Sequence, residues 1–178
     1  PDNAVLNDVA ALPDGGIAVT HMYDRENETL AQLKSFIGLS DGYVWRWAPG
    51  SPPRIMGNTA AGMPNGIEIA RDGKSIWVGE RCGANSCWDA KAGEMSKLDI
   101  ILKFDANGAL VKSFGAGMAV FPHGIHVDAD GNVWITEVED TLTRRAPGSA
   151  ADAPLPAPPA KVVGHQVIKF SPDGKVLL

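Results

Sequence analysis

The sequence lacks the features that would indicate a membrane or a nucleic acid partner. No stretch approaches the roughly eighteen consecutive apolar residues of a membrane span, and no signal-like segment stands at its start. The formal charge of −5 comes without any cluster of Lys or Arg, whereas binding to a phosphate backbone needs a concentrated basic surface. We therefore expect no membrane span and no nucleic acid partner.

Cysteine is scarce as well. The two cysteines, Cys82 and Cys87, lie five residues apart in ERCGANSCWD, and this pair alone lacks the further ligands that a metal site needs. We interpret them as a disulfide or as two inert thiols, and a disulfide requires an oxidising compartment. The sequence is most consistent with a mature secreted or periplasmic protein.

Helical periodicity is nearly absent, and an internal repeat takes its place. Asn7, Asn65 and His123 stand at equal intervals, since 65−7 = 58 and 123−65 = 58. Each opens a short apolar strand, an Asp-Gly turn and a second strand, as in LNDVAALPDGGIAVTH, PNGIEIARDGKSIWVGE and PHGIHVDADGNVWITE. A supersecondary unit repeated at long period is typical of a stacked or radial array. In a β-propeller, the equivalent ends of inner strands converge on the central channel, so these three side chains are expected to face one another.

The second half of each copy adds two more strands, in DGYVWRWAPG, DIILKFDANGALVKSF and GHQVIKFSPDGKVLL. Their alternation places Arg46, Lys103 and Lys169 on one face and Trp47, Phe104 and Phe170 on the other. The predicted fold is all-β, a propeller of four-stranded antiparallel blades over residues of about 4–60, 61–119 and 120–178. About three blades cannot close a ring that usually has about four to eight. The missing blades of a six-bladed ring are expected from the rest of a longer chain or, less favoured, from a second copy.

Three insertions interrupt the blades at one point of the repeat. The first carries a helical pattern over about 26–37. The others cover about 81–98 and 141–163, and the last is rich in Ala and Pro. All three are expected to project from the same rim, where loops can form a lid or a pocket wall, although a flexible excursion without function is favoured for the third.

Residues of about 6–80 resemble the paraoxonase and gluconolactonase (senescence-marker protein) propellers, through LND, VTHMYD and PNGIEIARDGKSIWVGE. In these families an Asn in each of the ND and NG motifs binds a catalytic calcium, which implies Asn7 and Asn65 as metal ligands. The third ligand position carries His123 instead of Asp or Asn. Imidazole suits zinc and other transition metals, whereas calcium prefers oxygen, so the cofactor is expected to be calcium or zinc.

Residues of about 76–178 resemble the NHL-repeat propellers, especially the peptidyl-hydroxyglycine amidating lyases, through ERCG, DIILKFDANGALVKSFG and FPHGIHVDADGNVWITEVED. This resemblance implies that His123 binds zinc, that the carbonyl of Ile125 binds a structural calcium and that Arg81 contacts the substrate. The other lyase ligands lie on later blades. His165 heads a third strand rather than a first, so it does not replace them.

Three functions follow as hypotheses. The first is a metal-dependent lactonase or arylesterase, in which a channel metal polarises an ester or lactone carbonyl and His21 or Glu80 is the base. The second is an amidating lyase acting on a peptide-derived substrate, and the third is a secreted binding propeller without catalysis. Structural roles compete for each residue. Asn7 and Asn65 can cap turns. Glu80 and Glu137 are expected to be solvated at the rim. Three further side chains are expected to be buried between sheets: Trp77, Trp134 and His126.

Overall fold

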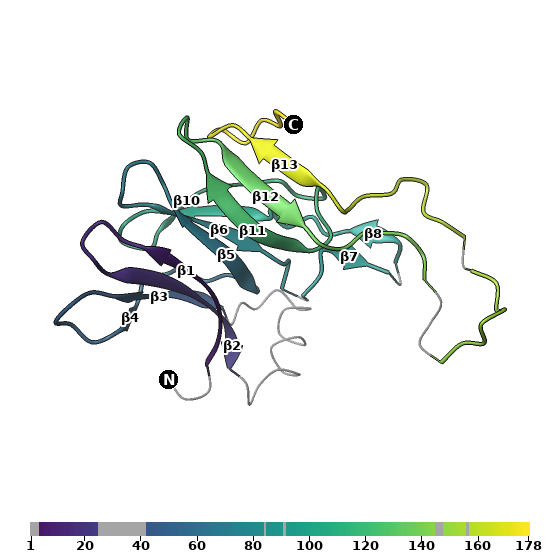
Figure 1. Cartoon of the computed structure of the whole chain (residues 1–178), viewed down its shortest axis with the longest axis horizontal. Coiled ribbons are helices and arrows are strands. Elements are labelled where there is room, and N and C mark those ends of the chain that lie inside the picture. Colours follow the sequence, from purple (N-terminus) through teal and green to yellow (C-terminus); the bar gives the residue numbers. More distant parts are fainter. Residues whose placement is uncertain (1–3, 25–41, 84, 91, 145–147, 156) are drawn as a thin grey trace.

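The computed structural model describes residues 4–24, 42–83, 85–90, 92–144, 148–155 and 157–178. Three antiparallel sheets follow one another along the chain and lie side by side (Figure 1). The described residues form no α-helix, and they include no helix that is long and apolar enough to cross a membrane. The helix predicted over 26–37 falls outside these residues.

Two of the three sheets have the predicted four strands, and the third has three. The first contains β1 (Ala4–Ala11), β2 (Ile17–Asp24), β3 (Tyr43–Trp47) and β4 (Arg54–Ile55), in that order. The second contains β5 (Pro64–Ile69), β6 (Ile76–Glu80), β9 (Ile101–Phe104) and β10 (Leu110–Phe114), also in sequence order. The third contains β11 (Pro122–Val127), β12 (Val133–Glu137) and β13 (Val167–Phe170), and a single bridge from Phe170 to Val176 stands where a fourth strand would pair. The hairpin of β7 (Trp88–Asp89) and β8 (Glu94–Met95) lies in the insertion after β6.

The first strands of the three sheets are neighbours in space. Strand β5 packs against both β1 and β11. A Cβ atom placed on Gly66 would lie 2.6 Å from the carbonyl oxygen of His123, so only glycine permits this approach of two backbones. The strands that carry Asn65 and His123 are thereby brought into contact.

Two hydrophobic cores fill the spaces between the sheets. Strand β6 serves both cores because its side chains alternate between its two faces. Ile76 and Val78 pack with residues of the first sheet, including Val44. Trp77 packs with residues of the third sheet, including Phe170, as predicted for inter-blade packing.

The predicted alternation of cations and aromatics holds for two of the three sheets. Phe104 and Phe170 are buried, while Lys103 and Lys169 lie 5.2 and 4.6 Å above the rings of Trp77 and Trp134. Trp47 is 38% exposed. The expectation that His126 packs between sheets is wrong, because its side chain is 66% exposed and faces Glu68 at 3.6 Å.

Candidate functional site

The same β-bulge interrupts the inner strand of each sheet. In the first sheet Leu6 pairs with His21 and Val9 with Val19, so three residues of β1 span the same length as two of β2. The register skips identically between Pro64 and Ile67 of β5 and between Pro122 and Ile125 of β11. Bulges re-aim side chains and recur next to active sites. Asn7, Asn65 and His123 each lie within their bulge, at equivalent positions.

Threonine hydroxyls hold two of the three bulges. Thr20 Oγ1 accepts a hydrogen bond from the Asp8 backbone N–H at 3.0 Å, and Thr136 Oγ1 accepts one from the Gly124 N–H at 2.9 Å. Thr20 also donates to the Asn65 carbonyl oxygen at 2.7 Å, which joins the first bulge to the second. The carboxylate of Asp8 adds a second link, because its Oδ2 accepts the Ile67 N–H at 3.0 Å.

The side chains at the three bulges differ in exposure but share a lack of partners. Asn65 is buried, and its Nδ2 has no hydrogen-bond partner. Asn7 and His123 are exposed, and within the described part of the chain neither side chain has a hydrogen-bond partner. Convergence of the three on one ion stays a prediction. Ile125 follows the third bulge and pairs with Ile135, and its carbonyl likewise remains a predicted ligand.

Two buried glutamates fasten the loops that lead into the inner strands. Glu80 Oε1 accepts the N–H groups of Met63 and Gly83 at 2.8 and 3.2 Å, and Glu137 Oε1 accepts the N–H groups of Val120 and Phe121. The second oxygen, Oε2, has no partner in either residue. The expectation that both are solvated rim residues is therefore wrong, because each replaces water as the acceptor for backbone groups.

Burial changes the acidity of these carboxyls. It raises the pKa of Glu80 to about 7, against the opposing effect of the Met63 and Gly83 N–H groups. It also raises the pKa of Glu137, opposed by the N–H groups of Phe121 and Val120. Glu80 thus carries a proton over part of the range near neutral pH, a property suited to general acid–base chemistry.

His21 lies at the position in its sheet that Glu80 occupies in the second sheet, opposite the residue before the bulge. It is 1% exposed and its ring packs edge-on against Tyr43, with centroids 4.2 Å apart. Its Nε2 lies 3.2 Å from Asp24 Oδ1, an ion-pair distance without hydrogen-bond geometry. The His21 ring is therefore buried between its neighbours and does not face solvent.

Arg81 follows Glu80 and is also buried. Its Nε donates to the Pro122 carbonyl oxygen at 3.1 Å, its Nη1 donates to Asn85 Oδ1 at 2.9 Å, and its guanidinium carbon lies 3.7 Å from the centre of the Phe121 ring. Removal from water lowers its pKa to about 10, an effect that the charge of Glu139 opposes. These contacts use two of the five N–H donors of the guanidinium and one of its faces, and its predicted contact with substrate remains a prediction.

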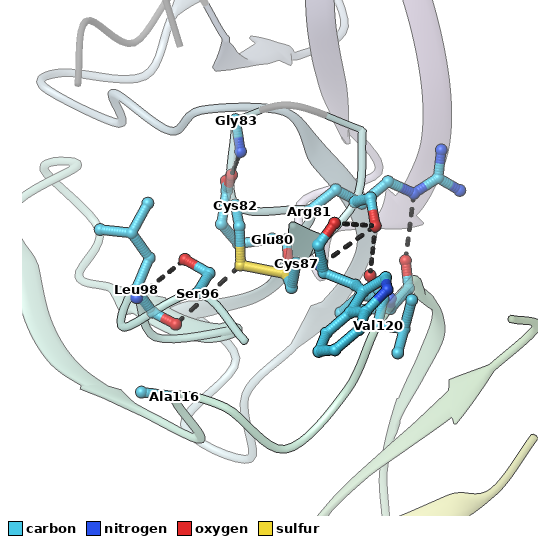
Figure 2. The surroundings of a disulfide bond; sticks show 12 residues. Glu80, Arg81, Cys82, Gly83, Cys87, Ser96, Leu98, Ala116 and Val120 are labelled. Carbon is cyan, nitrogen blue, oxygen red and sulfur yellow. Dashed lines mark hydrogen bonds between the residues drawn. A yellow bond between two sulfur atoms is a disulfide. The ribbon is translucent and has the colours of Figure 1, made fainter. Parts of the chain in front are cut away.

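A disulfide joins Cys82 to Cys87 in the insertion after β6. Between it and the β7–β8 hairpin lies an open hollow of about 520 Å³, lined in part by Trp88, Met95 and Leu98. The insertion is tied to the loop that leads into the third sheet, since the Cys87 N–H donates to the Val120 carbonyl oxygen at 2.6 Å. In Figure 2, Arg81 extends on the side of Val120, whereas Ser96 and Leu98 lie on the other side of the disulfide.

Sequence reasoning singled out the bulge residues but missed the groups that hold them. Thr20, Phe121 and the buried role of Glu137 went unrecognised. One signal was available, because VTH, VGE and ITE occupy matching places in the three repeats. Among the described residues, no group of three His, Cys, Asp or Glu side chains could hold a metal. A metal site here would depend on the oxygens of Asn7 and Asn65.

Sheets arranged in this way define a β-propeller, with its candidate site at the start of the inner strands. The family model described as the SMP-30/gluconolactonase/LRE-like region matches residues 1–178. The chain belongs to this family.

Two solved structures have the same fold. A gluconolactonase from Xanthomonas campestris superposes with a TM-score of 0.51 at 20% identity, over 97% of this chain and 45% of that chain. A luciferin-regenerating enzyme superposes with a TM-score of 0.53 at 15% identity, over 99% and 46%. At these identities the likeness concerns the fold alone.

The chain also resembles peptidylglycine α-amidating monooxygenases. It is 29% identical to the rat protein over 87 residues, and equally to the mouse protein. The matched part is 48% of this chain but only 9% of the relatives, so the chain spans a small part of their length.

Proposed function

We propose that this chain carries part of the active site of a metal-dependent lactonase or arylesterase. The observation that supports this most directly is the triple bulge, which repeats one backbone distortion at Asn7, Asn65 and His123 in a member of the gluconolactonase-like family. The substrate class would be a small ester or lactone.

The residues at the bulges fit a divalent cation. The amide of Asn65 is buried with an unpartnered nitrogen, and because amide oxygen and nitrogen are interchangeable by a flip, a carbonyl oxygen can stand in its place. The His123 ring has no hydrogen-bond partner among the described residues. The imidazole suits zinc, whereas the two amide oxygens suit calcium, which would draw on further oxygens such as the Ile125 carbonyl. When bound, such a cation polarises a carbonyl and stabilises an oxyanion.

The chain's own groups would position substrate and move protons. Water is the nucleophile in this proposal, and a base must take its proton. Glu80 is supported by its unpartnered Oε2 and its raised pKa, whereas His21 is supported by its equivalent position in the first sheet. Loss of the pH dependence of kcat/KM in Glu80→Gln, with His21→Gln retaining it, would assign the base to Glu80.

The test is hydrolysis of gluconolactone by chelator-treated protein to which zinc or calcium is restored. His123→Ala is expected to lose both bound metal and activity while keeping the circular dichroism of the wild type, because its side chain is exposed rather than in a core. His126→Ala, an exposed histidine of the same strand, is the matched control and should retain both. A His123→Ala variant that keeps its metal and its activity would show that the repeated position is only structural.

A zinc-dependent amidating lyase is the second candidate. It is supported by the local identity with the amidating monooxygenases and by the nearness of Arg81 to the segment before His123. Turnover of a peptidyl-hydroxyglycine in place of a lactone, with zinc and not with calcium, would favour it. If the protein contains no bound metal after dialysis, the third hypothesis, a binding propeller without catalysis, would be favoured.

The remaining assignments are also proposals. We place the blade boundaries at residues of about 4–60, 61–119 and 120–178, with further blades supplied by a longer chain or by a second copy. A secreted or periplasmic location is supported by the Cys82–Cys87 disulfide, since such bonds persist in oxidising compartments.

A further inference from the structure

One residue, Arg81, connects the two loops that enter the strands of Asn65 and His123, through its backbone to the first loop and through its side chain to the second. The backbone N–H of Arg81 donates to the Met63 carbonyl oxygen at 3.3 Å, two residues before Asn65. Its guanidinium Nε donates to the Pro122 carbonyl oxygen at 3.1 Å, one residue before His123. A single residue of the second sheet is therefore bonded to the approach of both candidate ligands.

The guanidinium also fixes the ring beside His123. It lies 3.7 Å above the centre of the Phe121 ring, and that ring is nearly parallel to the imidazole of His123, with centroids 6.5 Å apart and an interplanar angle of 19°. Asn85 accepts a hydrogen bond from Nη1 at 2.9 Å and so restricts the rotation of the guanidinium. Three planar groups, those of Arg81, Phe121 and His123, succeed one another toward the candidate site.

Burial of this cation needs a reason. Arg81 is 6% exposed, and although the charge of Glu139 acts on it, no ion pair among the described residues includes its guanidinium. Removal from water is costly for a charge, and the residues that follow His21 and Glu137, the counterparts of Glu80 in the first and third sheets, are the apolar Met22 and Val138. An apolar side chain would be the less costly choice for stability alone. Arginine offers a planar group that can donate and stack at once, which lysine does not.

We propose that Arg81 is a positioning residue that fixes the spacing and orientation of His123 relative to Asn65. This inference rests on the proposed metal function. Between the first two sheets, Thr20 makes the corresponding link through its bond to the Asn65 carbonyl oxygen. Thr20 links the first bulge to Asn65, and Arg81 links the approach to Asn65 with the approach to His123, so that Asn65 and His123 are each held by a residue of the preceding blade.

Arg81→Lys tests the proposal, because lysine keeps the charge but loses the Nε bond and the planar stack. Calorimetric titration of the 178-residue protein with zinc, and separately with calcium, should show affinity reduced by about ten- to a hundredfold, as for other residues that orient metal ligands. Arg71→Lys, in the exposed turn after β5, is the matched control and should bind as the wild type does. Phe121→Leu removes the aromatic ring but leaves the bonds of Arg81 to the Met63 and Pro122 carbonyl oxygens. This variant should also bind metal more weakly than the wild type.

Other outcomes would overturn the proposal. Unchanged metal affinity in Arg81→Lys, together with a raised KM for carboxylate-bearing substrates, would make Arg81 a substrate-contact residue. If the wild type binds neither metal, the proposed function fails first, and the positioning claim is then decided by NMR of the metal-free protein. The His123 ring resonances should shift in Arg81→Lys and not in Arg71→Lys, and their coincidence with those of the wild type would refute the claim.

Discussion

Among single residues, Glu80 shows how one carboxyl can serve the fold at one oxygen and remain free at the other. Its Oε1 holds the Met63 N–H, and its buried Oε2 has no partner. The protonated form satisfies this arrangement better than the anion does, because burial penalises charge. Protonation of Glu80 is therefore linked to folding.

We predict that this linkage makes stability fall as pH rises. The folded-state pKa of Glu80 is about 7 against an ordinary 4.5, so the contribution is fully present below pH 4.5 and is lost as pH rises through about 7. At about 1.4 kcal/mol per pKa unit, the loss is on the order of 3 kcal/mol. Urea unfolding from pH 5 to 8 should show this decline in the wild type and a flatter profile in Glu80→Gln.

The matched control for that measurement is Glu94→Gln, which changes an exposed glutamate of β8 and should keep the wild-type decline. A Glu80→Gln profile parallel to that of the wild type would mean that Glu80 does not carry the linkage.

Thr20 is predicted to matter far more than its counterpart Thr136. Thr20 is fully buried and bonded to both Asp8 and Asn65, so Thr20→Val strands a backbone N–H and a carbonyl. We expect a loss of about 1–3 kcal/mol in the free energy of unfolding. Thr136→Val should cost under about 1 kcal/mol, because Thr136 is exposed and water can replace its hydroxyl. Denaturant titration measures both, and equal losses would contradict the assigned link.

The limits of sequence reasoning are clearest at this scale. The period of two correctly placed Phe104 and Phe170 inside, because alternation follows directly from strand geometry. It could not place Glu80 or His126. The burial of each of these side chains depends on contacts with a neighbouring sheet or loop, and a local sequence pattern contains no information about such contacts.

Among the structural elements, strands β5 and β11 approach each other closely near the site. Gly66 allows it, since a Cβ would lie 2.6 Å from the His123 carbonyl oxygen and 3.0 Å from the Ile125 nitrogen. The 58-residue repeat and its Asp-Gly turns predicted these strands. The bulges within them were not predicted, because an extra residue in one strand shows only when its partner's register is known.

Gly66→Ala is expected to destabilise the protein by about 1–3 kcal/mol through overpacking. Gly124→Ala is the control at the equivalent bulge, where the new Cβ would meet only the Thr136 hydroxyl, at 3.1 Å. Thermal unfolding of the two variants gives the comparison. Two similar melting temperatures would indicate that the strands can separate without cost.

The disulfide is predicted to stabilise the insertion after β6 by about 2 kcal/mol, since it closes a short loop. Cys82→Ser with Cys87→Ser should lower the free energy of unfolding by that amount and increase proteolysis between residues 82 and 98. Mass spectrometry after alkylation without reduction should find neither cysteine of the wild type alkylated, because both sulfurs are in the disulfide. Alkylation of both in protein from an oxidising compartment would contradict the bond.

For the whole molecule, the position of each sheet in the row decides how well its inner strand is covered. Val9, Ile67 and Ile125 stand at equivalent places just after the bulge. Ile67 is 4% exposed beneath the first sheet, whereas Val9 is 56% exposed. Within the described residues, the face of β1 that includes Leu6 and Val9 is thus an inter-blade surface that no other sheet covers.

We expect the 178-residue chain to self-associate through this face, since large exposed apolar surfaces drive association. Light scattering after size exclusion should give a mass above that of the 18.8 kDa chain. Val9→Lys should shift the mass toward a single chain, and the exposed Leu155→Lys should not. A wild-type protein of one chain at all concentrations would contradict this expectation.

The threefold bulge has a consequence for how this architecture can diversify. Each distorted segment is shaped by its own backbone register, and the side chain at its apex contributes little to either core. At the exposed positions of Asn7 and His123, we therefore expect that exchange between amide, imidazole and carboxylate leaves the surrounding strands undisturbed. A single substitution at one of these positions is then expected to change which cation the protein prefers, while the fold stays the same.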